Sequence, residues 1–171
     1  MTGTIRPARP DDVAAIVGLI GDLADYERAA HEVHVTDAML RDALFGPAPA
    51  VFAHVATASA DGEGDVVGFA LWFLTFSTWL GRHGIYLEDL YVRPEHRGAG
   101  HGRALLATLA AIAVERGYGR VEWAVLDWNE PALGFYRAIG AVPLDEWRTH
   151  RLTGVALGTL AAGAAGYDPA P

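Results

Sequence analysis

Apolar side chains recur along this chain with two kinds of spacing, one typical of helices and one typical of strands. Between residues 13 and 26 and again between residues 100 and 116 they return every three or four positions, which predicts two amphipathic helices. Two shorter helices are predicted over residues 36–45 and 129–140. The first has a threonine cap, the second has an asparagine cap, and glycine marks the end of each.

Short apolar runs between these helices predict strands. The expected strands cover residues 4–7, 51–58, 66–74, 85–92 and 121–126, with one or two more within residues 142–152. The order β-α-α-β-β-β-α-β-α-β predicts an α/β (α+β) fold, with a central mixed sheet of six or seven strands flanked by helices.

The chain length predicts a single domain covering residues 1–171. A loop is expected at residues 77–84. Residues 155–171, rich in alanine and glycine, are expected to form a weak helix and a frayed tail.

Composition excludes several classes of function. The formal net charge of −8 argues against a nucleic-acid partner, which requires a basic face. No apolar run approaches the roughly 20 residues of a membrane span, and the N-terminus lacks a signal-peptide pattern, so a cytoplasmic protein without a membrane partner is expected. The absence of cysteine removes thiolate nucleophiles and Cys-ligated metal. His31, Glu32 and His34 lack a further ligand, so no metal site is predicted.

The most informative segment runs from Tyr86 through the basic, glycine-rich turn Arg97-Gly-Ala-Gly-His-Gly-Arg103. This segment is predicted to connect the end of an apolar strand to the start of a helix. The first turn of that helix contains no acidic residue. Glycines let backbone N–H groups converge, and the positive end of a helix favours anions. The spacing matches neither a P-loop nor a dinucleotide fingerprint. The turn therefore predicts a phosphate site of another kind.

This turn resembles the acetyl-CoA loop of the GNAT acetyltransferase family, Arg/Gln-x-x-Gly-x-Gly/Ala. Asn129-Glu-Pro-Ala-Leu-Gly-Phe-Tyr136 resembles the family's second motif. The diamine (spermidine/spermine) and thialysine acetyltransferase branch is the most similar. The resemblance to that branch includes Tyr86-Leu-Glu-Asp89 and Asp25-Tyr-Glu27. It implies the GNAT acyl-CoA N-acyltransferase fold, an acetyl-CoA co-substrate and a homodimer.

The resemblance also implies which residues hold the co-substrate. Backbone groups of the turn would bind the pyrophosphate, and residues on the preceding strand and on the helix predicted over residues 129–140 would hold the remainder. The implied positions are Leu90, Tyr91, Val92, Arg97, Gly98, Ala99, Gly100, His101, Gly102, Arg103, Asn129, Pro131, Ala132 and Tyr136. Arg97 and Arg103 have an alternative role as solvated surface charges.

Two residues are implied to be catalytic. Tyr136 would protonate the departing thiolate, a task suited to a phenol whose ordinary pKa is about 10. Its alternative role is packing beside Phe135. Glu88 would accept the proton of the amine through water, with a structural or cation-binding role as the alternative. Asp89 points to the opposite face of the strand and is expected to be structural, paired with an arginine.

Acceptor recognition is implied to use Tyr26, Glu27, Glu88 and Glu146, with Asp145 as the alternative to Glu146. Carboxylates spaced along a groove suit the two ammonium groups of a diamine. The predicted function is acetyl transfer to a primary amine of a diamine or polyamine by direct attack in a ternary complex. The alternatives are thialysine, another amino acid or an aminoglycoside as acceptor, and, in a different class, a non-catalytic acetyl-CoA sensor.

Overall fold

The computed structural model describes residues 3–164 and 166, and their contacts divide the chain into two compact units. The first unit ends at Ala124 and the second begins at Val125. The expectation that they form a single domain stays a prediction.

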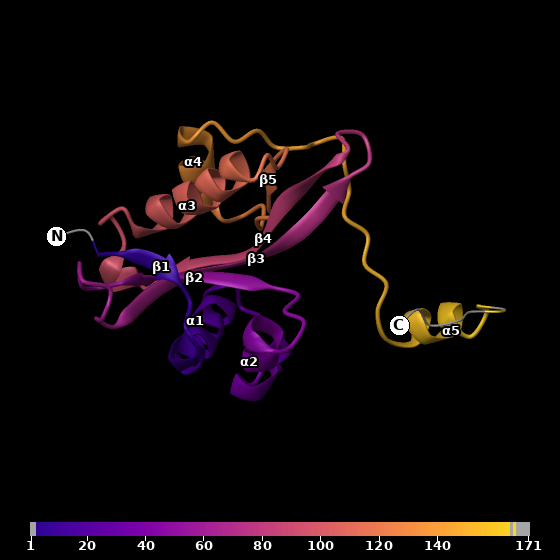
Figure 1. Cartoon of the computed structure of the whole chain (residues 1–171). Coiled ribbons are helices and arrows are strands. Elements are labelled where there is room, and N and C mark those ends of the chain that lie inside the picture. Colours follow the sequence, from indigo (N-terminus) through magenta and orange to yellow (C-terminus); the bar gives the residue numbers. More distant parts are fainter. Residues whose placement is uncertain (1–2, 165, 167–171) are drawn as a thin grey trace. The chain divides into compact units, whose positions relative to one another are not determined.

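The first unit is built on a mixed sheet whose strand order follows the sequence. Four neighbouring strands are antiparallel, and the last pair, β4 with β5, is parallel. The strands of the described residues are β1 (Ile5–Pro7), β2 (Phe52–Thr57), β3 (Val66–Ser77), β4 (Arg82–Val92) and β5 (Val121–Glu122). Figure 1 shows β3 and β4 as the long central hairpin of this sheet.

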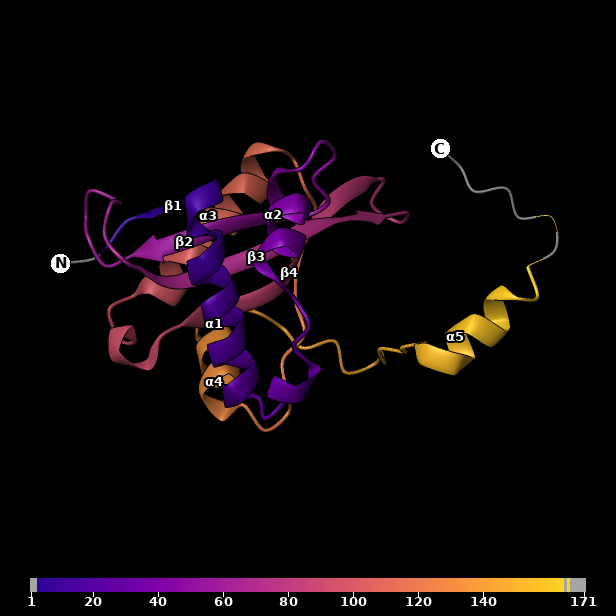
Figure 2. The same ribbon diagram turned by 90° about the horizontal axis from the view of Figure 1, so that it is seen from below.

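Helices cover both faces of the sheet. Helices α1 (Val13–Tyr26) and α2 (Asp37–Phe45) lie on one face, and α3 (His101–Glu115) lies on the other (Figures 1 and 2). Short 3₁₀ turns at Pro10–Asp12, Ala30–Glu32 and Pro94–His96 connect these elements. The predicted helical faces are confirmed.

The core forms where the apolar faces meet the sheet. Ile16 and Leu19 of α1 pack with Val55 and Phe69, all fully buried. On the other face, Leu105 of α3 is also fully buried. Side chains alternate along each strand, so β2 and β3 contribute apolar residues to both layers.

An ion pair fixes the entry of the chain into α1. Arg6 Nη1 on β1 lies 2.6 Å from Asp12 Oδ2, with side-chain exposures of 13% and 9%. The backbone N–H of Arg9 also donates to Asp12, at 2.6 Å. Arg6 Nε further donates to the carbonyl of Gly62, in the turn between β2 and β3. This cluster therefore ties the first strand, the first helix and the first hairpin together.

The second unit contains α4 (Glu130–Ala138) and α5 (Gly154–Ala161). The strands predicted within residues 142–152 are absent from this described segment, and β5 covers only Val121–Glu122. The described sheet therefore has five strands, fewer than the six or seven predicted. Pro143 removes a backbone donor, and the acidic pair Asp145-Glu146 breaks the alternation that a half-buried strand needs.

The structure also corrects the loop predicted at residues 77–84. β3 continues to Ser77 and β4 begins at Arg82, so the two strands pair almost to the turn. Phe76 stacks edge-on against His83 across the pair, with ring centroids 5.3 Å apart. Cross-strand aromatic contacts of this kind extend a hairpin beyond its apolar core.

The Asp12 cluster generates a stability prediction. Asp12→Asn should lower the free energy of unfolding by about 2–4 kcal/mol, because Arg6 then keeps a mostly buried charge without its counterion. Burial alone would raise the pKa of Asp12, but the hydrogen bonds from Arg6 and the Arg9 N–H hold that pKa below its ordinary value. The stabilisation is therefore present above about pH 3.9 and is lost as the pH falls through the lower folded-state pKa.

Denaturation by guanidinium chloride at pH 7 and at acid pH measures this effect. Glu63→Gln is the matched control, because Glu63 pairs with Arg9 at 2.9 Å in an exposed position. The control should change the free energy of unfolding by less than about 1 kcal/mol. Equal losses in the two variants would contradict a special role for Asp12.

Candidate active site

The entrance to α3 is a helix N-terminus without a capping side chain. Gly100 occupies the N-cap position, makes no side-chain cap and is followed by a first turn with no acidic residue. The first N–H groups of a helix have no carbonyl partner within it. These N–H groups, together with the helix dipole, favour an anion at this point.

The turn before α3 depends on glycine for its backbone conformation. Gly98 and Gly100 have φ angles of 80° and 88°, in the left-handed region that favours glycine. A Cβ added at either position would meet nothing within 4 Å. Backbone conformation, rather than crowding, therefore accounts for these two glycines, and the space beside them stays open.

The side chain of Arg97 is held by contacts within the protein. Arg97 donates from Nε to the carbonyl of Val92 at 2.8 Å. Its guanidinium lies over the rings of Tyr26 and Tyr91, at 5.4 and 5.3 Å from their centroids. These contacts hold the turn against α1 and β4. The direct contact of the Arg97 side chain with phosphate stays a prediction.

Two further positions of the turn differ in exposure. His101 is buried, with its ring 6.5 Å from that of His96. Arg103 is exposed to solvent. In this geometry His101 offers an anion its backbone N–H, whereas the Arg103 guanidinium lies on the surface next to the turn.

A β-bulge interrupts the pairing of β4 with β3 at Glu88. Leu71 of β3 pairs with Asp89, but the next residue, Trp72, pairs with Leu87. Glu88 is therefore the extra residue on β4, and its side chain is exposed. A bulge re-aims a side chain and bends its strand. In the sequence the two adjacent carboxylates Glu88 and Asp89 interrupt the apolar run, but nothing in that pattern marks a bulge.

Three carboxylates gather around this bulge. Burial raises the pKa of Asp89 to about 6, with further contributions from the negative charges of Glu88 and Glu27. Burial also raises the pKa of Glu27, at the C-terminal end of α1. Glu27 and Glu88 therefore both lie near enough to Asp89 to act on its pKa, and their common role in an acceptor site stays a prediction.

Asp89 departs from its predicted role. It was expected to pair with an arginine, but no arginine forms an ion pair with it in residues 3–164. The nearest charges that act on Asp89 are negative. A carboxyl group with a raised pKa, in an acidic site, becomes a stronger receptor for a cation than a neutralised pair would be.

The ladder between β4 and β5 is short, which leaves part of a strand edge available. Only Ile85 and Tyr86 of β4 pair with β5, whereas β3 accompanies β4 on its other side to Val92. Leu90, Tyr91 and Val92 therefore lie beyond the end of the β5 ladder. Such an edge presents backbone N–H and C=O groups that an extended ligand can meet.

The remaining predicted residues belong to the second unit. Asn129 caps α4, because its Oδ1 accepts from the N–H of Ala132 at 3.3 Å. Pro131 lies in the first turn, and the ring of Tyr136 contacts that of Phe135 at 5.3 Å between centroids. Glu146 follows α4. The meeting of these residues with Glu88 stays a prediction.

Two searches of the described residues gave negative results. No group of three or more histidine, aspartate or glutamate side chains with metal-binding geometry was found among residues 3–164 and 166. No helix in those residues combines the length and the apolar character needed to cross a membrane.

Comparison with known proteins places this geometry in context. The sequence profile of the Acetyltransferase (GNAT) family matches residues 18–141. Thialysine N-epsilon-acetyltransferase of Bos taurus is 39% identical over 164 residues, covering 92% of this chain and 96% of the relative. L-ornithine N5-acetyltransferase of Arabidopsis thaliana is 34% identical over 198 residues, covering 92% of this chain and 87% of the relative.

A solved structure supports the same fold. An integron cassette protein from V. cholerae superposes with a TM-score of 0.76 and is 27% identical, covering 94% of this chain and 98% of its own. The α/β fold predicted from the sequence is therefore confirmed.

The raised pKa of Asp89 predicts a pH-dependent stability difference. Since the folded protein holds this proton more tightly than the unfolded chain, Asp89 lowers stability as the pH rises from about 4 to about 6. Asp89→Asn removes that loss. The variant should therefore gain stability relative to the parent across this window, by up to about 2 kcal/mol, and keep a constant difference above it.

Thermal unfolding at several pH values between 4 and 8 measures the effect. Glu115→Gln, an exposed carboxylate at the end of α3, is the control for removal of a negative charge. A parallel shift of the Asp89→Asn curve at all pH values would show that Asp89 titrates as it does in the unfolded chain.

Proposed function

The chain belongs to the Acetyltransferase (GNAT) family, and from this premise we propose that it acetylates a primary amine of a small polycation, a diamine or polyamine. It is an N-acetyltransferase. The observation that supports a polycationic acceptor is the cluster of three carboxylates, Glu27, Glu88 and Asp89, at the β4 bulge. Closely spaced acids hold ammonium groups more readily than neutral or anionic acceptors.

The co-substrate proposed is acetyl-CoA, which supplies an acetyl thioester. The uncapped entrance to α3 fits its pyrophosphate, since backbone N–H groups from Gly98 to Arg103 and the helix dipole offer a compensating positive field. The edge of β4 from Leu90 to Val92 would accompany the extended arm of the molecule. Asn129, Pro131 and Ala132 are further co-substrate contacts that the resemblance implies.

The first chemical task is to free the attacking nitrogen of its proton. A primary ammonium has an ordinary pKa of about 10, so it is mostly charged at neutral pH. Glu88, exposed at the bulge, would take this proton through a water molecule. Asp89 and Glu27 would hold the ammonium and the distal charge of the acceptor. In the proposed reaction the free amine then attacks the thioester carbonyl directly, and the chain has no cysteine that could form an acetyl-cysteine intermediate.

The second task is to neutralise the departing sulfur. As the carbon–sulfur bond breaks, the Tyr136 phenol would donate its proton to the thiolate and later recover one from solvent. Tyr136 lies two helical turns from the Asn129 cap, on the same face of α4. One face of this helix would therefore contribute both a contact with the co-substrate and the acid.

A second acceptor class is the side-chain amine of a basic amino acid. The relatives named for thialysine and L-ornithine acetylation favour it. Such an acceptor also carries a carboxylate, which the acidic group at the β4 bulge would disfavour unless a cation elsewhere compensates. The diamine therefore remains the first proposal, and the amino acid is the direct competitor in the assay below.

Two broader proposals follow from the resemblance. The chain would act as a homodimer, as the similar diamine acetyltransferase branch implies, and it would act in the cytoplasm. Gel filtration with light scattering tests the first.

Tyr136→Phe tests the acid. The variant should lower kcat by about 10²-fold, because thiolate departure loses its proton donor, while acetyl-CoA affinity changes little. Steady-state kinetics and calorimetric titration of acetyl-CoA measure the two quantities. Phe135→Leu is the control for loss of aromatic packing on α4. An unchanged kcat in Tyr136→Phe would remove this residue from the mechanism.

A panel of amines tests the acceptor class. With acetyl-CoA present, release of free thiol should be fastest with a diamine or polyamine, and Glu27→Gln should raise the KM for that amine by about tenfold with a smaller effect on kcat. Glu63→Gln, an exposed acid outside the site, is the control. A thousandfold preference for ornithine or thialysine would overturn the diamine proposal.

The same assay separates an enzyme from a sensor. Thermal stabilisation by acetyl-CoA without thiol release from any amine would identify a non-catalytic binding protein. At about 100 times its Kd, the ligand should stabilise the folded protein by about 2.7 kcal/mol in either case.

A further inference from the structure

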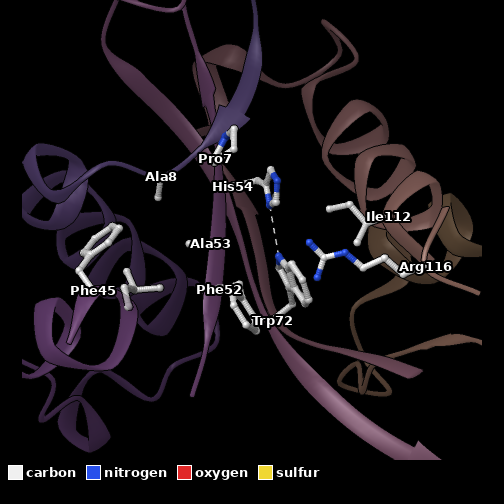
Figure 3. Close-up of a pocket in the computed structure, with 10 residues that line it drawn as sticks. Pro7, Ala8, Phe45, Phe52, Ala53, His54, Trp72, Ile112 and Arg116 are labelled. Atoms are coloured by element: carbon white, nitrogen blue, oxygen red, sulfur yellow. Dashed lines mark hydrogen bonds between the residues drawn. The ribbon is translucent and has the colours of Figure 1, made fainter. Parts of the chain in front are cut away.

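A cavity at the other end of α3 has no part in the acetyl-transfer site. Its volume is about 380 Å³, and its lining includes the last part of α3, the start of β2 and the end of α2 (Figure 3). Neither the residues of the turn at Gly98–Arg103 nor the carboxylates at the β4 bulge line it. The lining residue Ile112 lies 12 residues beyond Gly100, so about 18 Å of helix separates the two places.

The walls of the cavity are largely apolar and aromatic. The rings of Phe52 and Trp72 stack with centroids 4.6 Å apart and planes 30° apart. Ile112 of α3 adds aliphatic surface on the side of β2 that carries His54, whereas Leu44 and Phe45 of α2 line the cavity from the other side of β2 (Figure 3). The volume lies within the roughly 300–1,000 Å³ typical of small-molecule sites. These walls suit an apolar or aromatic body.

One polar group in this wall is fixed as a hydrogen-bond donor. His54 is only 9% exposed, and its Nδ1 accepts from Trp72 Nε1–H at 3.2 Å. A neutral imidazole that accepts at Nδ1 carries its proton at Nε2. Burial lowers the pKa of His54, which keeps the ring neutral. In Figure 3 the second ring nitrogen lies on the side of the ring that faces α3.

No protein acceptor meets this donor within the described residues. The Trp72 contact is the single side-chain hydrogen bond of His54 in that part of the chain. Among the described residues the one fully buried side-chain atom without a partner is Thr75 Oγ1, so the Nε2–H of His54 is open to solvent or to a ligand. The cavity is where such an acceptor would lie.

A positive charge stands at the rim of the same cavity. Arg116 follows the last turn of α3, is exposed and forms no ion pair among residues 3–164. Figure 3 shows its side chain extending from α3 toward the cavity. A guanidinium offers a planar fork of N–H donors that matches a carboxylate.

We propose that this cavity binds a small monocarboxylate with an apolar or aromatic body, whose carboxylate accepts from Arg116 and from His54 Nε2–H. One cation and one neutral donor match a single negative charge. A phosphate would bring a second negative charge that nothing in the cavity balances. An amine would meet two donors and no acceptor side chain. The cavity therefore favours an anionic ligand, whereas the carboxylates at the β4 bulge favour a cation.

Phenylacetate is the probe, and phenylacetamide is its neutral match in size. Titration calorimetry should show saturable binding of phenylacetate and binding of the amide that is at least about tenfold weaker, because the charged hydrogen bonds are lost. Arg116→Gln should weaken phenylacetate binding by about tenfold. Arg41→Gln, an exposed arginine on α2 outside the cavity, should leave binding unchanged.

Two further measurements fix the location. Ile112→Trp should fill the cavity and abolish phenylacetate binding while coenzyme A still binds. In the parent protein, saturating coenzyme A should not displace phenylacetate. Equal binding of the acid and the amide, full binding by a folded Arg116→Gln or Ile112→Trp variant, or displacement by coenzyme A would each overturn the proposal.

Discussion

Strand β4 is the constraint on which the rest of the site depends. Its antiparallel ladder with β3 fixes it in the core, and its bulge turns Glu88 out of register beside Asp89. The same strand leads directly into the turn before α3. Any shift of register along β4 would move the carboxylates and the helix entrance together. A single strand therefore sets the distance between the proposed amine site and the proposed anion site.

This strand carries groups that lower stability. Asp89 lies among other negative charges with its pKa raised by burial, and the entrance to α3 lacks the side-chain cap that most helices use. A folded protein tolerates such features where a ligand is to supply the missing partner, an ammonium for the carboxylates and a phosphate for the amides. Binding of both substrates would thus stabilise the places that the free protein leaves unsatisfied.

The sequence predicted the parts of the fold that depend on local pattern. Periodic apolar residues, such as Ile16 and Leu105, predicted the two long helices of the first unit. The predicted Asn129 cap was confirmed, because its Oδ1 accepts from the N–H of Ala132. The turn at Gly98 and Gly100 was recognisable because left-handed backbone requires glycine. These features depend on a few neighbouring residues, so they can be seen without knowing tertiary contacts.

Features that depend on pairing between distant segments could not be predicted in this way. The bulge at Glu88 is a property of the β3–β4 register, and the electrostatic coupling of Asp89 to Glu27 joins a strand to the end of a helix. Strands expected within residues 142–152 require a partner that pattern alone does not supply. The resemblance to a known family supplied the role of Glu88, but not its bulged position.

The two ends of α3 illustrate how one helix can serve opposite charges. At its start, unpartnered N–H groups and the positive end of the dipole favour an anion. At its end, where the dipole favours cations, Arg116 supplies one and thereby makes a second anion site at a helix end that would otherwise repel anions. Arg116 is stabilised by the dipole in the absence of a ligand, so the site would need no ligand to stay folded. The first end depends on backbone and must keep its glycines, whereas the second depends on one side chain and is open to change by a single substitution.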